Sequence, residues 1–93
     1  MEENLEEVKK ESSNPITDLS YSPDGRFIAG VGGRRITIWE RLSGKRIKTF
    51  LSKDNLISVW YSPDGKEIAV GDSYGRILVY NHSGRLLKEM MNG

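Results

Sequence analysis

Hydrophobic residues along the chain form short runs, each about five residues long and bounded by turns rich in Gly, Pro, Asp and Ser. Runs of this length between turn residues are typical of β-strands. The Ser-Pro-Asp-Gly tetrapeptides place Pro second and Gly fourth, as a type I turn prefers. The pattern predicts eight strands, at 16–21, 27–31, 35–39, 46–51, 56–61, 67–71, 76–80 and 86–91.

The predicted strands form two copies of one unit. Tyr21-Ser-Pro-Asp-Gly25 recurs as Tyr61-Ser-Pro-Asp-Gly65, which is an offset of 40 positions. The offset becomes 41 for the third strands and returns to 40 for the fourth. Length changes confined to loops are expected when a duplicated unit keeps its strands and varies its turns. We therefore predict structural units at 14–53 and 54–93, preceded by a charged tail or short helix at 1–13.

Both predicted third strands are apolar on their two faces. Ile36 and Ile38 alternate with Trp39 on the opposite side, and the second copy repeats this arrangement with Ile77, Leu78, Val79 and Tyr80. A strand with two apolar faces needs material packed on both sides of its sheet. Four-stranded antiparallel sheets stacked face to face meet that need, so the fold class is all-β.

A period near 40 with four strands in each unit resembles a blade of the WD-repeat β-propeller family. The residues that carry the resemblance are Ile16-x-x-Leu19-x-Tyr21-Ser-Pro-Asp-Gly25, Phe27-Ile-Ala-Gly30, Ile36-Thr-Ile-Trp39-Glu40 and Ser43-Gly44, with Leu56 to Gly65, Ile68 to Gly71, Ile77 to Asn81 and Ser83-Gly84 in the second copy. The resemblance implies two consecutive blades over residues 14–93. The family's Gly-His pair would fall at Glu11-Ser12 and Leu51-Ser52, and its hairpin Asp at Arg34 or Tyr74, so its His-Asp-Trp network is absent.

Two blades leave two apolar faces without a partner, because a propeller typically has four to eight blades and each packs on two neighbours. The second copy ends where a new one would begin, so a head-to-tail ring of copies would read as a continuous propeller. We expect six blades from three chains or eight from four, with the tetramer preferred. The residues expected at the packed faces are Leu19, Tyr21, Ile36, Ile38, Trp39, Val59, Tyr61, Ile77, Val79 and Tyr80.

Composition excludes several classes of function. The chain has no cysteine, so it has no disulfide framework and no thiolate metal site. It has no run of about 18 apolar residues, and its first residues are rich in Glu where a signal peptide would be basic and then apolar. These features predict a cytoplasmic protein without a membrane partner.

Candidate catalytic and metal-binding residues are few. His82 is the only histidine and lies in a predicted turn, where we expect it to be exposed. One histidine per chain does not make a metal site. Ser83, His82 and Asp72 supply the residue types of a catalytic triad, but neighbouring residues point apart and no nucleophile elbow surrounds the serine. We predict no enzyme activity, cofactor or metal.

Basic residues concentrate in the first unit, which carries eight Lys and Arg against three acidic residues, whereas the second carries four against five. Arg34 and Arg35 share one hairpin loop, and a ring would repeat that loop three or four times.

The leading hypothesis is a non-enzymatic, self-assembling scaffold for protein interaction, including an engineered or excised blade pair. One alternative is the binding of an anion or a nucleic acid through these loops, although a pI near 8.0 disfavours nucleic acid. The other alternative is an accessory domain of a propeller enzyme, with Asp18 or Ser20 lining the central channel.

Overall fold

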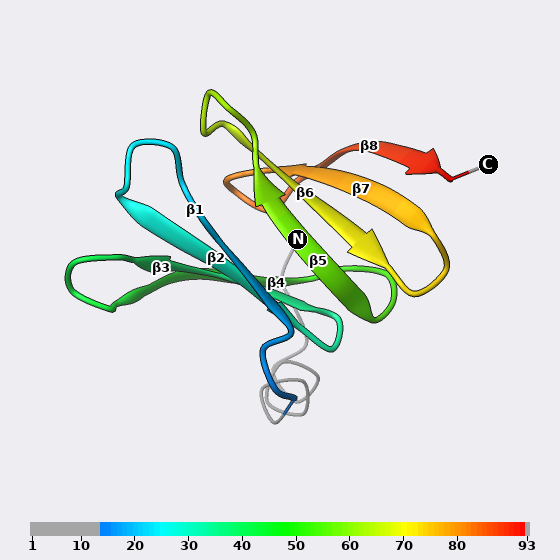
Figure 1. Cartoon of the computed structure of the whole chain (residues 1–93), viewed down its shortest axis with the longest axis horizontal. Coiled ribbons are helices and arrows are strands. Elements are labelled where there is room, and N and C mark those ends of the chain that lie inside the picture. The colour runs from blue at the N-terminus through cyan, green and yellow to red at the C-terminus, as the bar shows by residue number, and fades with distance from the viewer. Residues whose placement is uncertain (1–13, 93) are drawn as a thin grey trace.

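The computed structural model describes residues 14–92 as two four-stranded antiparallel sheets (Figure 1). The first sheet contains β1 (Asp18–Tyr21), β2 (Phe27–Gly32), β3 (Arg35–Glu40) and β4 (Arg46–Leu51). The second contains β5 (Leu56–Tyr61), β6 (Glu67–Asp72), β7 (Arg76–Asn81) and β8 (Leu86–Met91). Each sheet is a meander in which neighbouring strands along the chain are hydrogen-bonded. The tail predicted at 1–13 lies outside the described residues.

All eight predicted strands are present, and β4, β5 and β8 have the predicted bounds. β1 begins at Asp18, two residues later than predicted. Thr17 still donates its N–H to the Val31 carbonyl at 2.7 Å, while its hydroxyl donates to the Leu56 carbonyl of the second sheet at 3.3 Å. β2, β3, β6 and β7 each extend one residue further, so their turns are correspondingly shorter.

The Ser-Pro-Asp-Gly segments form the predicted turns. In the first, the Gly25 N–H donates to the Ser22 carbonyl at 3.0 Å, which closes a four-residue turn. The Asp24 carboxylate accepts from the Ser22 hydroxyl at 2.7 Å and from the Arg26 N–H at 3.0 Å. The second turn makes the same set of bonds through Ser62, Asp64 and Lys66. These bonds to the charged form hold the pKa of both aspartates below the usual value of 3.8.

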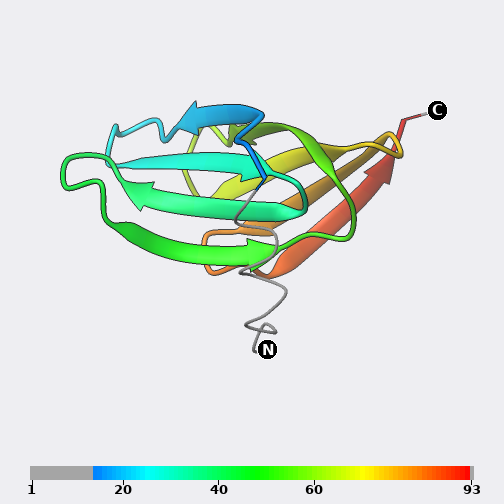
Figure 2. The same ribbon diagram turned by 90° about the horizontal axis from the view of Figure 1, so that it is seen from below.

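The two sheets pack face to face, and Figure 2 shows the first sheet, from β1 to β4, lying across one side of the second. We call the side that carries Ile36 and Ile38 the front face of the first sheet, and the side that carries the equivalent Ile77 and Val79 the front face of the second. The opposite sides are the back faces. The front of the first sheet packs on the back of the second, and the core between them consists of Ala29, Val31, Ile36, Ile38, Phe50, Leu56, Val59, Ile68, Val70, Leu78 and Tyr80.

Alternation along the strands produces this arrangement, because directly paired residues of neighbouring strands share one face. Ile36 pairs with Val31 on one side and Phe50 on the other, and all three are buried. Leu78 likewise pairs with Val70 on the back of the second sheet. Among residues 14–92, no helix has the length and apolar character needed to cross a membrane.

Candidate functional site at the faces of the two sheets

The internal interface between the sheets combines apolar packing with hydrogen bonds along its edge. The Leu56 N–H donates to the Gly33 carbonyl at 2.7 Å, so the backbones meet directly. Asp18 accepts from the Val59 N–H at 2.9 Å, and the Ser20 hydroxyl accepts from the Tyr61 N–H at 3.1 Å. Asp18 and Ser20, proposed from the sequence as channel-lining residues of an enzyme, therefore hold β5 against β1.

One buried polar contact joins the outer half of this interface. The hydroxyls of Ser52, which follows β4, and Tyr80 on β7 lie 2.8 Å apart, and both residues are buried. The Tyr80 ring packs against Phe50 with 5.2 Å between ring centroids. Burial raises the pKa of the Tyr80 hydroxyl, although its bond to Ser52 opposes the shift. This contact fixes the lateral position of one sheet on the other.

Among residues 14–92, no segment covers the back face of the first sheet. Leu19 is 57% exposed and Tyr21 67% exposed, although both are large and apolar. Trp39 lies on the same face and covers Gly30, where an added Cβ would come within 2.8 Å of the indole ring. A glycine at this position lets the indole ring approach the backbone of β2 closely.

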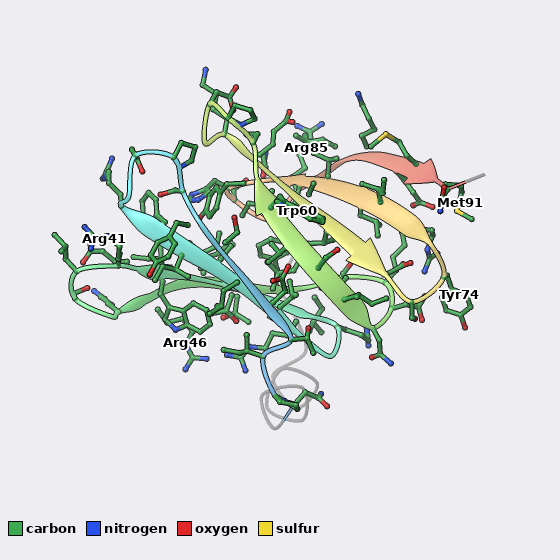
Figure 3. The ribbon with its side chains drawn as sticks, in the orientation of Figure 1. Arg41, Arg46, Trp60, Tyr74, Arg85 and Met91 are labelled. Atoms are coloured by element: carbon green, nitrogen blue, oxygen red, sulfur yellow. The ribbon has the colours of Figure 1, made fainter. Side chains whose placement is uncertain are left out.

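In the part of the chain that the structure describes, the front face of the second sheet is also an uncovered apolar surface. Trp60 on β5 is 62% exposed, and Ile77 and Met90 are each 40% exposed. Figure 3 shows Trp60 on β5, with Met91 near the C-terminal end of the same sheet. Exposed apolar surfaces of this kind mark association sites on soluble proteins.

The ten residues expected at the packed faces divide between these three surfaces. The internal interface contains Ile36, Ile38, Val59, Tyr61 and Tyr80. The open back face carries Leu19, Tyr21 and Trp39, and the open front face carries Ile77 and Val79. Sequence reasoning therefore placed apolar residues on faces but did not separate those covered within one chain from those left open.

His82 is not the exposed turn residue expected from the sequence. Its ring packs edge-on against Phe27 of the first sheet, with centroids 4.8 Å apart, and its Nε2 lies 2.8 Å from the Tyr61 hydroxyl. Burial between the sheets lowers the pKa of His82 below 6.5, despite the nearby Asp24 charge. The prediction failed because the contact depends on how the two sheets meet.

The residue types of the catalytic triad do not come together. His82 and Ser83 follow the end of β7, whereas Asp72 precedes its start and accepts from the Arg76 guanidinium at 2.8 Å. Arg76 also forms an ion pair with Asp54, which makes a carboxylate-guanidinium-carboxylate cluster at the β6–β7 hairpin. Although burial disfavours its charge, the N–H groups of Arg76 and Tyr74 and the guanidinium hold the pKa of Asp72 below 3.8.

The Asp54-Arg76-Asp72 cluster was not anticipated from the sequence. The hairpin Asp expected from the family pattern falls at Tyr74, whereas the acidic residue of this turn is Asp72. An Asp four residues before an Arg across a short hairpin was the available signal. Within the part of the chain that the structure describes, no group of three His, Cys, Asp or Glu residues could hold a metal ion.

Arg34 and Arg35, the candidate anion-binding residues, both make contacts with the first sheet. The Arg34 Nε donates to the Ser52 carbonyl at 3.3 Å, and the Arg35 Nε donates to the Thr37 hydroxyl at 3.0 Å. The two guanidinium groups thus help to hold the edge and back of the sheet.

Comparison with known proteins identifies the type of repeat. Residues 5–40 match the family model described as WD domain, G-beta repeat. The chain is 41% identical over 64 residues to an uncharacterized WD repeat-containing protein of Synechocystis sp., covering 63% of this chain and 18% of that protein. It is 32% identical over 76 residues to human protein NEDD1, covering 80% of this chain and 11% of that protein. The chain thus spans less than a fifth of these relatives.

Solved structures support the fold. A crystal structure of RRP9 WD40 repeats matches with a TM-score of 0.77 at 24% identity, covering 85% of this chain and 26% of that one. Hydrazine synthase of Kuenenia stuttgartiensis matches with a TM-score of 0.76 at 19% identity, covering 84% and 24%. At these identities the likeness concerns the fold alone, and it places both sheets among propeller blades.

Proposed function

Because the chain belongs to the WD-repeat family, we propose that it is a non-enzymatic scaffold for protein interaction whose two blades assemble, copy to copy, into a closed β-propeller ring. The proposal rests on one observation: within residues 14–92, one front face and one back face are left open. Within the chain, a front face and a back face are the two surfaces that pack together.

The open faces correspond to the two halves of the internal interface. On the open front face, Ile77 and Val79 occupy the positions that Ile36 and Ile38 have in the first blade. On the open back face, Trp39 is equivalent to Tyr80, because Trp39 pairs with Ile28 in the first blade and Tyr80 pairs with the equivalent Ile68 in the second. A second copy that repeats the internal packing would therefore cover both surfaces. Because such a contact is heterologous, it forms either a closed ring or an open filament.

Ring closure restricts the number of chains. Each copy contributes two blades, so a symmetric ring has an even number of blades. Propellers typically have four to eight blades, which corresponds to two, three or four copies, and two copies give only the smallest ring of this range. We prefer four. Such a ring displays every turn of the chain several times on its two end surfaces, which suits a scaffold that binds partners by multivalent contacts.

The test compares two aromatic residues. In Trp39→Asp, a charge replaces the indole on the open back face, and we expect a monomer that keeps a cooperative unfolding transition. Tyr74→Asp makes the same change at a turn residue that is 70% exposed and should leave the assembly unchanged. Light scattering on a sizing column measures both. A Trp39→Asp protein of wild-type size, or a monomeric wild type, would contradict the proposal.

A further inference from the structure

The contact between chains would differ chemically from the contact within the chain at one defined position. Inside the chain, Phe27 on the front of the first blade meets His82 on the back of the second. The repeat places Glu67 at the position of Phe27, since Phe27 pairs with Glu40 in its blade and Glu67 pairs with Asn81 in the other.

The position of His82 is taken by Arg41 in the first blade. His82 is the first residue after β7, and Arg41 is the first after β3. The Arg41 N–H donates to the Arg26 carbonyl at 2.9 Å, which extends the β2–β3 pairing by one step and fixes this register. Figure 3 shows Arg41 beyond the end of β3. An aromatic pair inside the chain thus corresponds to a carboxylate and a guanidinium on its two open faces.

A second pair of positions supports the same register. Inside the chain the buried hydroxyls of Ser52 and Tyr80 are bonded. Asn92 is the counterpart of Ser52, because Ser52 donates its N–H to the Arg34 carbonyl and Asn92 donates its N–H to the Gly75 carbonyl of the equivalent hairpin. Trp39 is the counterpart of Tyr80. An indole N–H is a donor only, and an Asn side chain offers the acceptor that it needs.

We propose that copies of the chain join through an ion pair between Glu67 of one copy and Arg41 of the next, with the Trp39 indole N–H donating to the Asn92 side chain at a second point of the same junction. This inference rests on the proposed ring and specifies which residues select its head-to-tail register. The charge of the blades favours the same pairing, since each contact brings the basic first blade against the acidic second blade of a neighbour.

The polar character of this junction has a consequence for assembly. The internal interface has an aromatic pair where the junction between chains has opposite charges, so salt weakens the junction more than it weakens the blade pair. Association between chains should therefore weaken as ionic strength rises, while the blade pair within each chain stays folded.

Charge exchange tests the pairing. Arg41→Glu and Glu67→Arg each place like charges at every junction, and we expect each to weaken association about fivefold or more per junction. The double variant R41E/E67R restores opposite charges and should return to within about twofold of the wild type by the same reasoning. Lys45→Glu makes the same charge change as Arg41→Glu at the other end of the same exposed β3–β4 turn and serves as the matched control.

Sedimentation velocity over a concentration series at low salt measures association, and urea unfolding checks each variant, whose changed residue is exposed. Recovery in R41E/E67R, with little change in Lys45→Glu, supports the pairing. An assembled wild type with single variants no weaker than Lys45→Glu overturns the ion pair and leaves the ring intact. A wild type that does not associate overturns the ring itself.

Discussion

The hydroxyl contact between Ser52 and Tyr80 provides a sharp test of how the two blades are held together. Tyr80→Phe removes one hydroxyl without changing the shape of the aromatic side chain, and it leaves the Ser52 hydroxyl buried without its partner. Ser52→Ala removes the other. Leaving a buried polar group unsatisfied costs about 1–3 kcal/mol, whereas removing both partners of a hydrogen bond costs much less than the sum of the two single changes.

The expected values follow from the burial of both residues. Each single variant should lower the free energy of unfolding by about 1–3 kcal/mol, and the coupling energy of the double-mutant cycle should be about 1 kcal/mol. Urea unfolding at constant protein concentration, followed by tryptophan fluorescence, measures all four proteins. Tyr74→Phe is the control, because Tyr74 is 70% exposed, and it should change stability by less than about 0.5 kcal/mol. Strictly additive effects of Tyr80→Phe and Ser52→Ala would refute the contact.

Two further predictions concern single positions. Gly84 and Gly44 are equivalent turn residues with φ of +93° and +73°, but an added Cβ meets Phe50 at 3.0 Å only at Gly84. Gly84→Ala should therefore lower the free energy of unfolding in urea by about 1 kcal/mol more than Gly44→Ala does. Equal losses in the two variants would argue against the contact with Phe50. Because the His82 pKa is lowered in the folded state, the unfolded chain takes up the proton first, and stability should fall as pH decreases below about 6.5 toward the lowered value. His82→Gln should lack this component in unfolding measured across that range, and an unchanged pH profile would argue that His82 is not desolvated.

Much of the fold could be predicted from the sequence because its signals are local. Turn chemistry in the two Ser-Pro-Asp-Gly segments and the alternation in the third strands depend on neighbouring residues, and the repeat checks each assignment twice. These signals identify the eight strands and their two apolar faces.

Less of the candidate site could be predicted from the sequence, because its contacts join residues that are far apart in the chain. The packing of His82 on Phe27 depends on the angle and offset at which two sheets meet, which no local pattern encodes. The same holds for the Thr17 hydroxyl, which donates to the Leu56 carbonyl of the other sheet. Asp72 was considered only as a residue type of a catalytic triad, and its contact with Arg76 across the hairpin was missed.

The most direct test of the account is native mass spectrometry of the wild-type chain at low ionic strength, which counts 10.5 kDa subunits in each particle. A closed ring predicts one discrete species of four chains, or of three. A folded monomer, or a ladder of sizes without a preferred number, would contradict the proposal that the open front and back faces cover each other in a closed propeller.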